Sequence, residues 1–153
     1  MPYNYYEITL QLIFAVRNRD ALISDSFREK LHAYITGIVK NQGQKLLIIN
    51  SVSDHIHILI GISPEMRISD LVREIKSESS AFINRHNLAS RRFYWQAGYG
   101  VFSYSISQRP RVINYIKNQQ IHHHRKTFKK EYLEFLNAFE INFKTSHLFE
   151  FFE

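Results

Sequence analysis

The chain has 153 residues, 44% of them hydrophobic, and this composition predicts a single folded domain with its own core. It contains no cysteine, which excludes disulfides and thiolate metal sites and favours a reducing, cytoplasmic setting. No apolar run approaches the ~18–20 residues that span a bilayer, and residues 1–10 lack the pattern of a signal peptide. The formal charge of +6 suits a polyanionic partner such as nucleic acid, although many basic proteins bind none.

The first part of the chain predicts a strand, a helix and a hairpin. Residues 5–16 are rich in β-branched, aromatic and aliphatic side chains, which predicts a long strand. Ser24 or Asp25 can cap the helix that follows. Residues 45–52 and 55–60 then predict two strands, which a tight turn joins as a hairpin.

The second part of the chain is mostly helical in pattern. An amphipathic helix is expected over residues 69–86 and a short strand over residues 101–105. Two more helices are expected over residues 111–122 and 127–139, the last of them capped by its first threonine. The aromatic and acidic residues 147–153 are expected to pack on the body of the protein or on a second subunit.

The order of these elements determines the expected fold class. Strand, helix, strand, strand, helix, strand and further helices predict an α+β two-layer sandwich. In this arrangement a mainly antiparallel sheet carries its long helices on one face. Residues 1–153 show no repeat or linker, so one domain is expected to cover them.

Two histidines stand out on the predicted third strand. Side chains alternate along a strand, so His55 and His57 project from one face while Ile56, Ile58 and Ile60 pack under the helices on the other. Two imidazoles at this spacing can hold one metal ion. Buried histidines that only satisfy a hydrogen bond are the more common case.

A tyrosine and a glutamine stand four positions apart on the next-to-last predicted helix. Tyr115 and Gln119 therefore share one face of that helix, although a core aromatic and a solvated amide would look the same. Two imidazole nitrogens and one amide oxygen would leave coordination positions open, as magnesium and manganese require. A phenol beside such a metal ion can attack a phosphorus atom.

These motifs together resemble the small insertion-sequence transposases of the single-tyrosine HUH class (histidine, hydrophobe, histidine), which includes the REP-associated tyrosine transposases. DHIHILI at residues 54–60 resembles the histidine strand of that family, and NYIKNQQIHH at 114–123 resembles the helix of its nucleophile. WQAGYGVFSYS at 95–105 and IKSESS at 75–80 resemble the segments expected before that helix. The resemblance covers nearly the whole chain.

The resemblance implies a fold, a reaction and a set of partners. The fold would be a ferredoxin-like antiparallel sheet in a single HUH domain. Tyr115 would attack a DNA phosphate, form a 5′-phosphotyrosine and release a 3′-hydroxyl. His55, His57 and Gln119 would bind Mg²⁺ or Mn²⁺. The substrate would be single-stranded DNA with hairpin-bearing element ends, and the working unit a bacterial or archaeal homodimer in which the tyrosine helix can be exchanged between subunits.

Basic and aromatic side chains suggest where DNA would bind. One cluster surrounds the tyrosine helix, and a second mixes charge with rings just before the last strand. Phe93 and Trp95 in that second cluster could equally belong to the core. The candidate DNA contacts are Arg91, Arg92, Tyr94, Arg109, Arg111, Lys117, Arg125 and Lys126.

Two other functions are compatible with parts of this pattern. A relative retained by its host could bind structured single-stranded DNA or RNA without transposition, but it would not need all four site residues. A metal-dependent hydrolase of small phosphoesters, with a structural Tyr115, would not need a basic, aromatic surface. The roles of His122, His123 and His124 stay open.

Overall fold

The computed structural model describes residues 3–152. Its long elements are β1 (Thr9–Ala15), α1 (Arg28–Asn41), β2 (Lys45–Ser51), β3 (His55–Gly61), α2 (Ile68–Arg85), β4 (Gly100–Tyr104), α3 (Arg109–Lys117), α4 (Gln119–Arg125) and α5 (Phe128–Ala138). Short 3-10 turns are η1 (Arg19–Ala21), η2 (Ile106–Gln108) and η3 (Thr145–His147). None of the helices in this described part is long and apolar enough to cross a membrane.

The sheet is antiparallel, with strand order β2-β3-β1-β4. β2 and β3 form a hairpin, and β3 also pairs with β1. In the register of β1 and β3, Ile13 lies opposite His57 and Ala15 opposite His55. Because β3 is a central strand, its side chains are held rigidly on both faces of the sheet. The α+β fold expected from the order of elements is confirmed.

The largest apolar cluster lies between one face of the sheet and α1 and α2. Leu12 and Phe14 of β1 and Ile56 and Ile58 of β3 point into it, as the alternation of side chains along a strand requires. Each of these four residues is fully buried. The isoleucines of the HIHILI strand therefore pack under the two long helices, as the sequence predicts.

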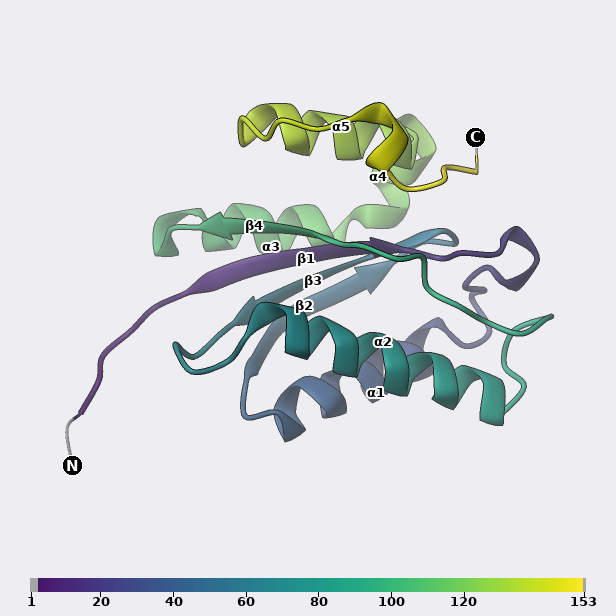
Figure 1. The fold of residues 1–153 in the computed structure, drawn as a ribbon, viewed down its shortest axis with the longest axis horizontal. Helices are drawn as coiled ribbons and strands as arrows, with labels where there is room; N and C mark the ends of the chain where they lie inside the picture. The colour runs from purple at the N-terminus through teal and green to yellow at the C-terminus, as the bar shows by residue number, and fades with distance from the viewer. Residues whose placement is uncertain (1–2, 153) are drawn as a thin grey trace.

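The other face of the sheet is covered as well, by α3, α4 and α5 (Figure 1). Ile13 and Ala15 pack against α5, and Leu59 packs against α3. The prediction that the long helices share one face of the sheet holds for α1 and α2. Because helices cover both faces of the sheet, every residue of β1 is buried, and that strand has no solvent face.

At the edges of the sheet one sequence prediction changes and one open alternative is resolved. The strand expected from residue 5 begins at Thr9, where pairing with β3 and β4 begins, and Tyr5 is 94% exposed. Phe93 and Trp95 belong to the core, and the indole nitrogen of Trp95 donates to Ser79 Oγ at 2.9 Å.

The end of the chain returns to the body of the protein. Phe149 and Phe151 contact Phe128 at the start of α5, with ring centroids 5.9 and 5.4 Å away. The end of the chain was expected to pack on the body of the protein or on a second subunit. Phe149 and Phe151 pack on the body of the same chain, and Glu153 lies outside the described residues. Thr127 caps α5 as predicted, because its side chain accepts from the backbone N–H of Lys130 at 3.2 Å.

Candidate active site

The two histidines of β3 point away from α1 and α2, into the space under α5. His55 is 1% exposed and His57 is fully buried, and their ring centroids are 5.0 Å apart. The ring of Phe128 stacks on His55 at 3.9 Å and limits its rotation. The strand therefore presents two ordered imidazoles on one face, as their spacing predicts.

Each imidazole uses its Nδ1 atom to donate a hydrogen bond. The Nδ1 of His55 lies 2.7 Å from Asp54 Oδ1, and a carboxylate can only accept. The Nδ1 of His57 lies 2.6 Å from Gln11 Oε1, whose own amide nitrogen donates to Tyr104. Both Nε2 atoms are thereby directed into the site. Metal-binding histidines are oriented in this way, with the remaining ring N–H on a carboxylate or carbonyl oxygen.

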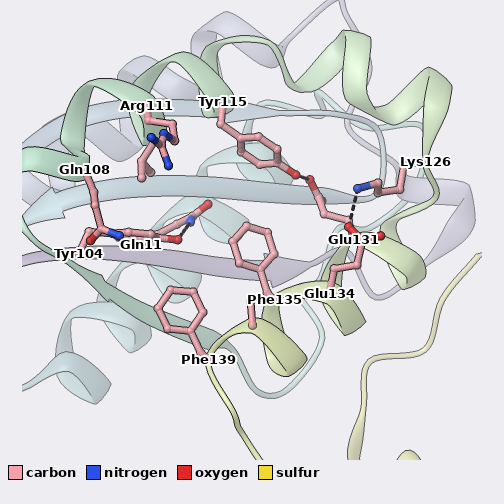
Figure 2. A pocket seen from close by; sticks show the side chains of 12 residues that line it. Gln11, Tyr104, Gln108, Arg111, Tyr115, Lys126, Glu131, Glu134, Phe135 and Phe139 are labelled. Carbon is pink, nitrogen blue, oxygen red and sulfur yellow. Dashed lines mark hydrogen bonds and ion pairs between the residues drawn. The ribbon is translucent and has the colours of Figure 1, made fainter.

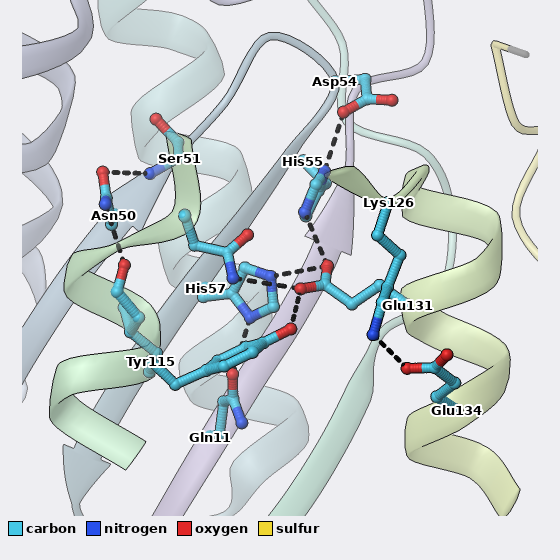
Figure 3. Close-up of polar contacts among 12 residues, drawn as sticks. Gln11, Asn50, Ser51, Asp54, His55, His57, Tyr115, Lys126, Glu131 and Glu134 are labelled. Atoms are coloured by element: carbon cyan, nitrogen blue, oxygen red, sulfur yellow. Dashed lines mark hydrogen bonds and ion pairs between the residues drawn. The ribbon is translucent and has the colours of Figure 1, made fainter. Parts of the chain in front are cut away.

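A glutamate from α5 lies at the centre of the site (Figure 3). Glu131 Oε1 lies 3.1 Å from Nε2 of His55 and 3.2 Å from Nε2 of His57. Its other oxygen, Oε2, accepts from the hydroxyl of Tyr115 and, at 3.0 Å, from the amide of Gln119. One carboxylate thus joins the predicted nucleophile to all three predicted metal ligands.

The donor set suits a divalent cation. Ligand atoms of His55, His57 and Glu131 all lie within 4.8 Å of one another, and the three residues are buried. With Nδ1 donating to Asp54 or Gln11, each Nε2 faces an oxygen of the Glu131 carboxylate. Such an arrangement needs a proton or a metal ion between the atoms. Two imidazole nitrogens and a carboxylate oxygen can hold one divalent metal ion, with water or substrate oxygens completing its shell.

The charges of the cluster are strongly coupled. Burial opposes ionisation of Glu131, but the adjacent imidazoles outweigh it and hold the pKa of that carboxyl well below its usual range. Burial also lowers the pKa of His55, yet hydrogen bonds to Asp54 and Glu131 prevail and raise it to about 9. At His57 the effect of burial outweighs that of the Glu131 carboxylate, so the pKa of His57 is lowered. Burial and the charge of Glu131 raise the pKa of Tyr115, so the phenol keeps its proton until that proton has an acceptor.

The tyrosine helix is interrupted, which corrects the continuous helix expected over residues 111–122. α3 ends at Lys117, and α4 begins at Gln119 after Asn118, whose φ is −100° and ψ 23°. Asn50 of β2 stabilises the break by donating to the carbonyls of Ile116 (2.8 Å) and Lys117 (3.1 Å). Tyr115 and Gln119 still converge, because both contact Glu131.

A histidine from α4 completes the surroundings of the phenol. The ring of His122 stacks on Tyr115 with centroids 4.4 Å apart and an interplanar angle of 21°. The imidazole of His123 instead lies 6.1 Å from His55. His122 therefore limits the rotation of the phenol.

The candidate DNA contacts fall into several environments. Arg111 and Lys126 line a cavity beside Tyr115, where Lys126 pairs with Glu134. Lys117 and Arg125 are exposed. Arg109 pairs with Glu7 and donates to Thr9, at the opposite end of β1 from the histidine pair. Arg91 lies 3.5 Å from Asp20, and Arg92 donates to the hydroxyl of Tyr94 at 2.9 Å.

Two residues at the centre of the site, Glu131 and Gln11, were not predicted from the sequence. Glu131 lies 74 positions after His57 in an ordinary amphipathic pattern, and nothing local distinguishes it from Glu134. The 4% exposure of Glu131 comes from the docking of α5 on the sheet. Gln11 did leave a signal, because it is a lone amide in the apolar strand TLQLIFA.

Comparison with known families places the chain among the transposases. The matching family model is described as transposase, IS200-like; it covers residues 4–119, and the chain belongs to this family.

Individual relatives agree in sequence and in fold. The ISDra2 transposase TnpA of Deinococcus radiodurans is 23% identical over 119 residues, covering 74% of this chain and 85% of that protein. The crystal structure of a putative transposase from Deinococcus radiodurans has a TM-score of 0.61 at 23% identity, covering 78% of this chain and 95% of the other. A REP-associated tyrosine transposase bound to a REP hairpin has a TM-score of 0.59 at 16% identity, covering 80% and 74%.

Proposed function

We propose that this transposase cleaves and rejoins single-stranded DNA through a covalent 5′-phosphotyrosine at Tyr115. One observation carries the proposal: a single buried carboxylate, Glu131, contacts the phenol of Tyr115 and the Nε2 atoms of His55 and His57. A structural tyrosine would not need two inward-directed imidazole nitrogens beside it.

The reaction is balanced without an external energy source. The phenolic oxygen attacks the phosphorus, and its proton passes to Glu131 Oε2, which already accepts the hydrogen bond. A phosphorus–oxygen bond to the tyrosine forms as the bond to the 3′-oxygen breaks, and the 3′-oxygen takes up a proton from water. A second 3′-hydroxyl then attacks the phosphotyrosine and gives its proton to the hydroxide left by the first step. The bond to the tyrosine breaks, a phosphodiester is restored, and the phenolate takes back the proton from Glu131.

His55, His57 and Gln119 would hold Mg²⁺ or Mn²⁺, with Glu131 as a further ligand. A divalent cation there would neutralise charge that develops on the phosphate oxygens. The protein's own part is to orient the ligands. Asp54 and Gln11 set the imidazole rings, and the break after α3 brings Gln119 to the same carboxylate as Tyr115.

We further propose hairpin-bearing single-stranded element ends as the substrate, a homodimer as the working unit and the cytoplasm as the location. The solved relative bound to a REP hairpin supports the hairpin, and the formal charge of +6 supports the polyanion. Tyr115 donates to Glu131, and its ring lies 6.2 Å from the ring of His57 in the same chain, so the active site is proposed to work in cis.

The test is capture of the covalent intermediate. Wild-type protein incubated with its own single-stranded element ends and Mg²⁺ or Mn²⁺ should give a protein–DNA adduct that survives denaturation. Tyr115→Phe should give none, and His57→Ala should lose the adduct while keeping much of its DNA binding, since basic contacts supply that affinity. An equal adduct yield with Tyr115→Phe would refute the assignment. Hairpin binding with no adduct from wild-type protein would favour a non-cutting relative.

A further inference from the structure

A cavity of about 510 Å³ opens directly beside the nucleophile. Tyr115 forms part of its wall, so a strand that brings a phosphate to the phenol would lie next to this cavity. Figure 2 shows Arg111 and Tyr115 on one side of the space and Phe135 and Phe139 on the other. The cavity therefore lies between α3 and α5, above β1 and β4.

The lining is aromatic at one end and charged at the other. The ring of Phe139 is 36% exposed, and it packs edge-on against Tyr104, with centroids 5.6 Å apart. The carboxylates of Glu131 and Glu134 lie towards the histidine site, and Glu134 pairs there with Lys126. The aromatic end suits a flat, uncharged ring, and the charged end adjoins the phenol that would meet the scissile phosphate.

The rim offers groups that a nucleotide could use. The guanidinium of Arg111 makes no ion pair with any residue between 3 and 152, so it is free to meet a backbone phosphate. Gln108 accepts from the backbone N–H of Ser105 through its amide oxygen at 2.8 Å, which leaves its NH₂ group available for a base edge. A volume of this size accommodates one nucleotide.

We propose that this cavity holds the base of a nucleotide that adjoins the scissile phosphate, stacked against Phe139 and with its phosphate on Arg111. This inference rests on the proposed function for the position of the scissile phosphate. It adds a direct contact between the protein and one unpaired base. Stacking accepts any base, so the cavity would orient the strand more than it reads its sequence.

Fluorescence anisotropy can measure the base contact separately from catalysis. The probes are labelled oligo(dT) of 15 nucleotides and an abasic strand of the same length, both in EDTA. Phe139→Ala should bind oligo(dT) roughly 5- to 150-fold more weakly, the range found when a stacking ring is removed. Its affinity for the abasic strand should be unchanged. Phe139→Leu, which keeps an apolar side chain, should weaken oligo(dT) binding in the same direction.

Phe143→Ala and Phe143→Leu are the matched controls, because Phe143 is 41% exposed and does not line the cavity. They should bind both probes as the wild type does. The inference is overturned if the Phe139 variants bind oligo(dT) normally, or lose both probes equally.

The two proposals fail in different ways. Normal oligo(dT) binding by Phe139→Leu, with an intact Tyr115 adduct on element ends, would remove the base cavity and leave strand transfer standing. A base-specific loss at Phe139 without any adduct from wild-type protein would keep the cavity and remove strand transfer.

Discussion

Replacing Glu131 with glutamine removes one negative charge from the centre of the proposed active site and keeps the size of the side chain. The carboxylate accepts from the hydroxyl of Tyr115 and from Gln119 and contacts both imidazoles, so no other single change affects all four residues. If Glu131 contributes to metal binding, Glu131→Gln should bind Mn²⁺ more weakly than the wild type.

The expected loss follows from the ligand chemistry. Changing a group that only orients a metal ligand already costs 10- to 100-fold in metal affinity. Loss of a direct carboxylate ligand should cost at least as much, or about 1.4–2.7 kcal/mol. The adduct yield should fall as well, because the amide that replaces Glu131 Oε2 is a poor acceptor for the phenolic proton.

Titration with Mn²⁺, followed by the spin resonance signal of the free ion, gives the affinity without any reaction. Glu134→Gln is the matched control, since it removes the same charge one turn further along α5 from an exposed residue that pairs with Lys126. Equal Mn²⁺ affinity for Glu131→Gln, Glu134→Gln and wild type would show that Glu131 lies in the site only as an acceptor for its neighbours.

Three further changes test other parts of the structure. Asn50→Ala should lower the free energy of unfolding by about 1–3 kcal/mol in urea, because the buried carbonyl of Ile116 at the end of α3 loses its donor. Asn118→Ala should lower it far less. Arg111→Gln should reduce the slope of log affinity against log salt for single-stranded DNA by about 0.7, whereas Arg109→Gln, whose residue already pairs with Glu7, should not. Burial, with the charge of Arg28, lowers the pKa of His32 from 6.5 to about 4. The neutral imidazole of His32 therefore contributes fully to the stability of the fold above pH 6.5, and this contribution is lost as the pH falls towards 4. Urea unfolding at pH 7 and pH 5 should therefore show about 2 kcal/mol less acid destabilisation in His32→Gln than in the wild type, and equal losses would show that His32 titrates normally.

The elements that followed from sequence patterns were those with a strong local signal. The helix expected over residues 69–86 is α2 (Ile68–Arg85), and the cap predicted at Thr127 is present. The alternation in HIHILI correctly separated the two histidines from the isoleucines. These features depend on periodicity and on capping chemistry, which a sequence displays directly.

The features that were missed depend on contacts between distant segments. Nothing near Asn118 in the sequence indicates a helix break, because its cause is a side chain of β2, Asn50. Glu131 is distinguished from Glu134 only by the direction in which α5 docks. The start of β1 depends on where its two neighbouring strands end, so the apolar pattern that begins at Tyr5 extends beyond the paired residues.

The division of the molecule into two apolar layers has a mechanical consequence. The buried members of the largest cluster come from β1, α1, β3, α2 and the segments around them, up to Trp95; among the described residues, none comes from α3, α4 or α5. The layer that carries Tyr115 and Glu131 rests on the opposite face, on two smaller clusters. If Tyr115 exchanges DNA ends as proposed, its layer can move while the larger cluster stays packed, so turnover would not require the whole protein to unfold.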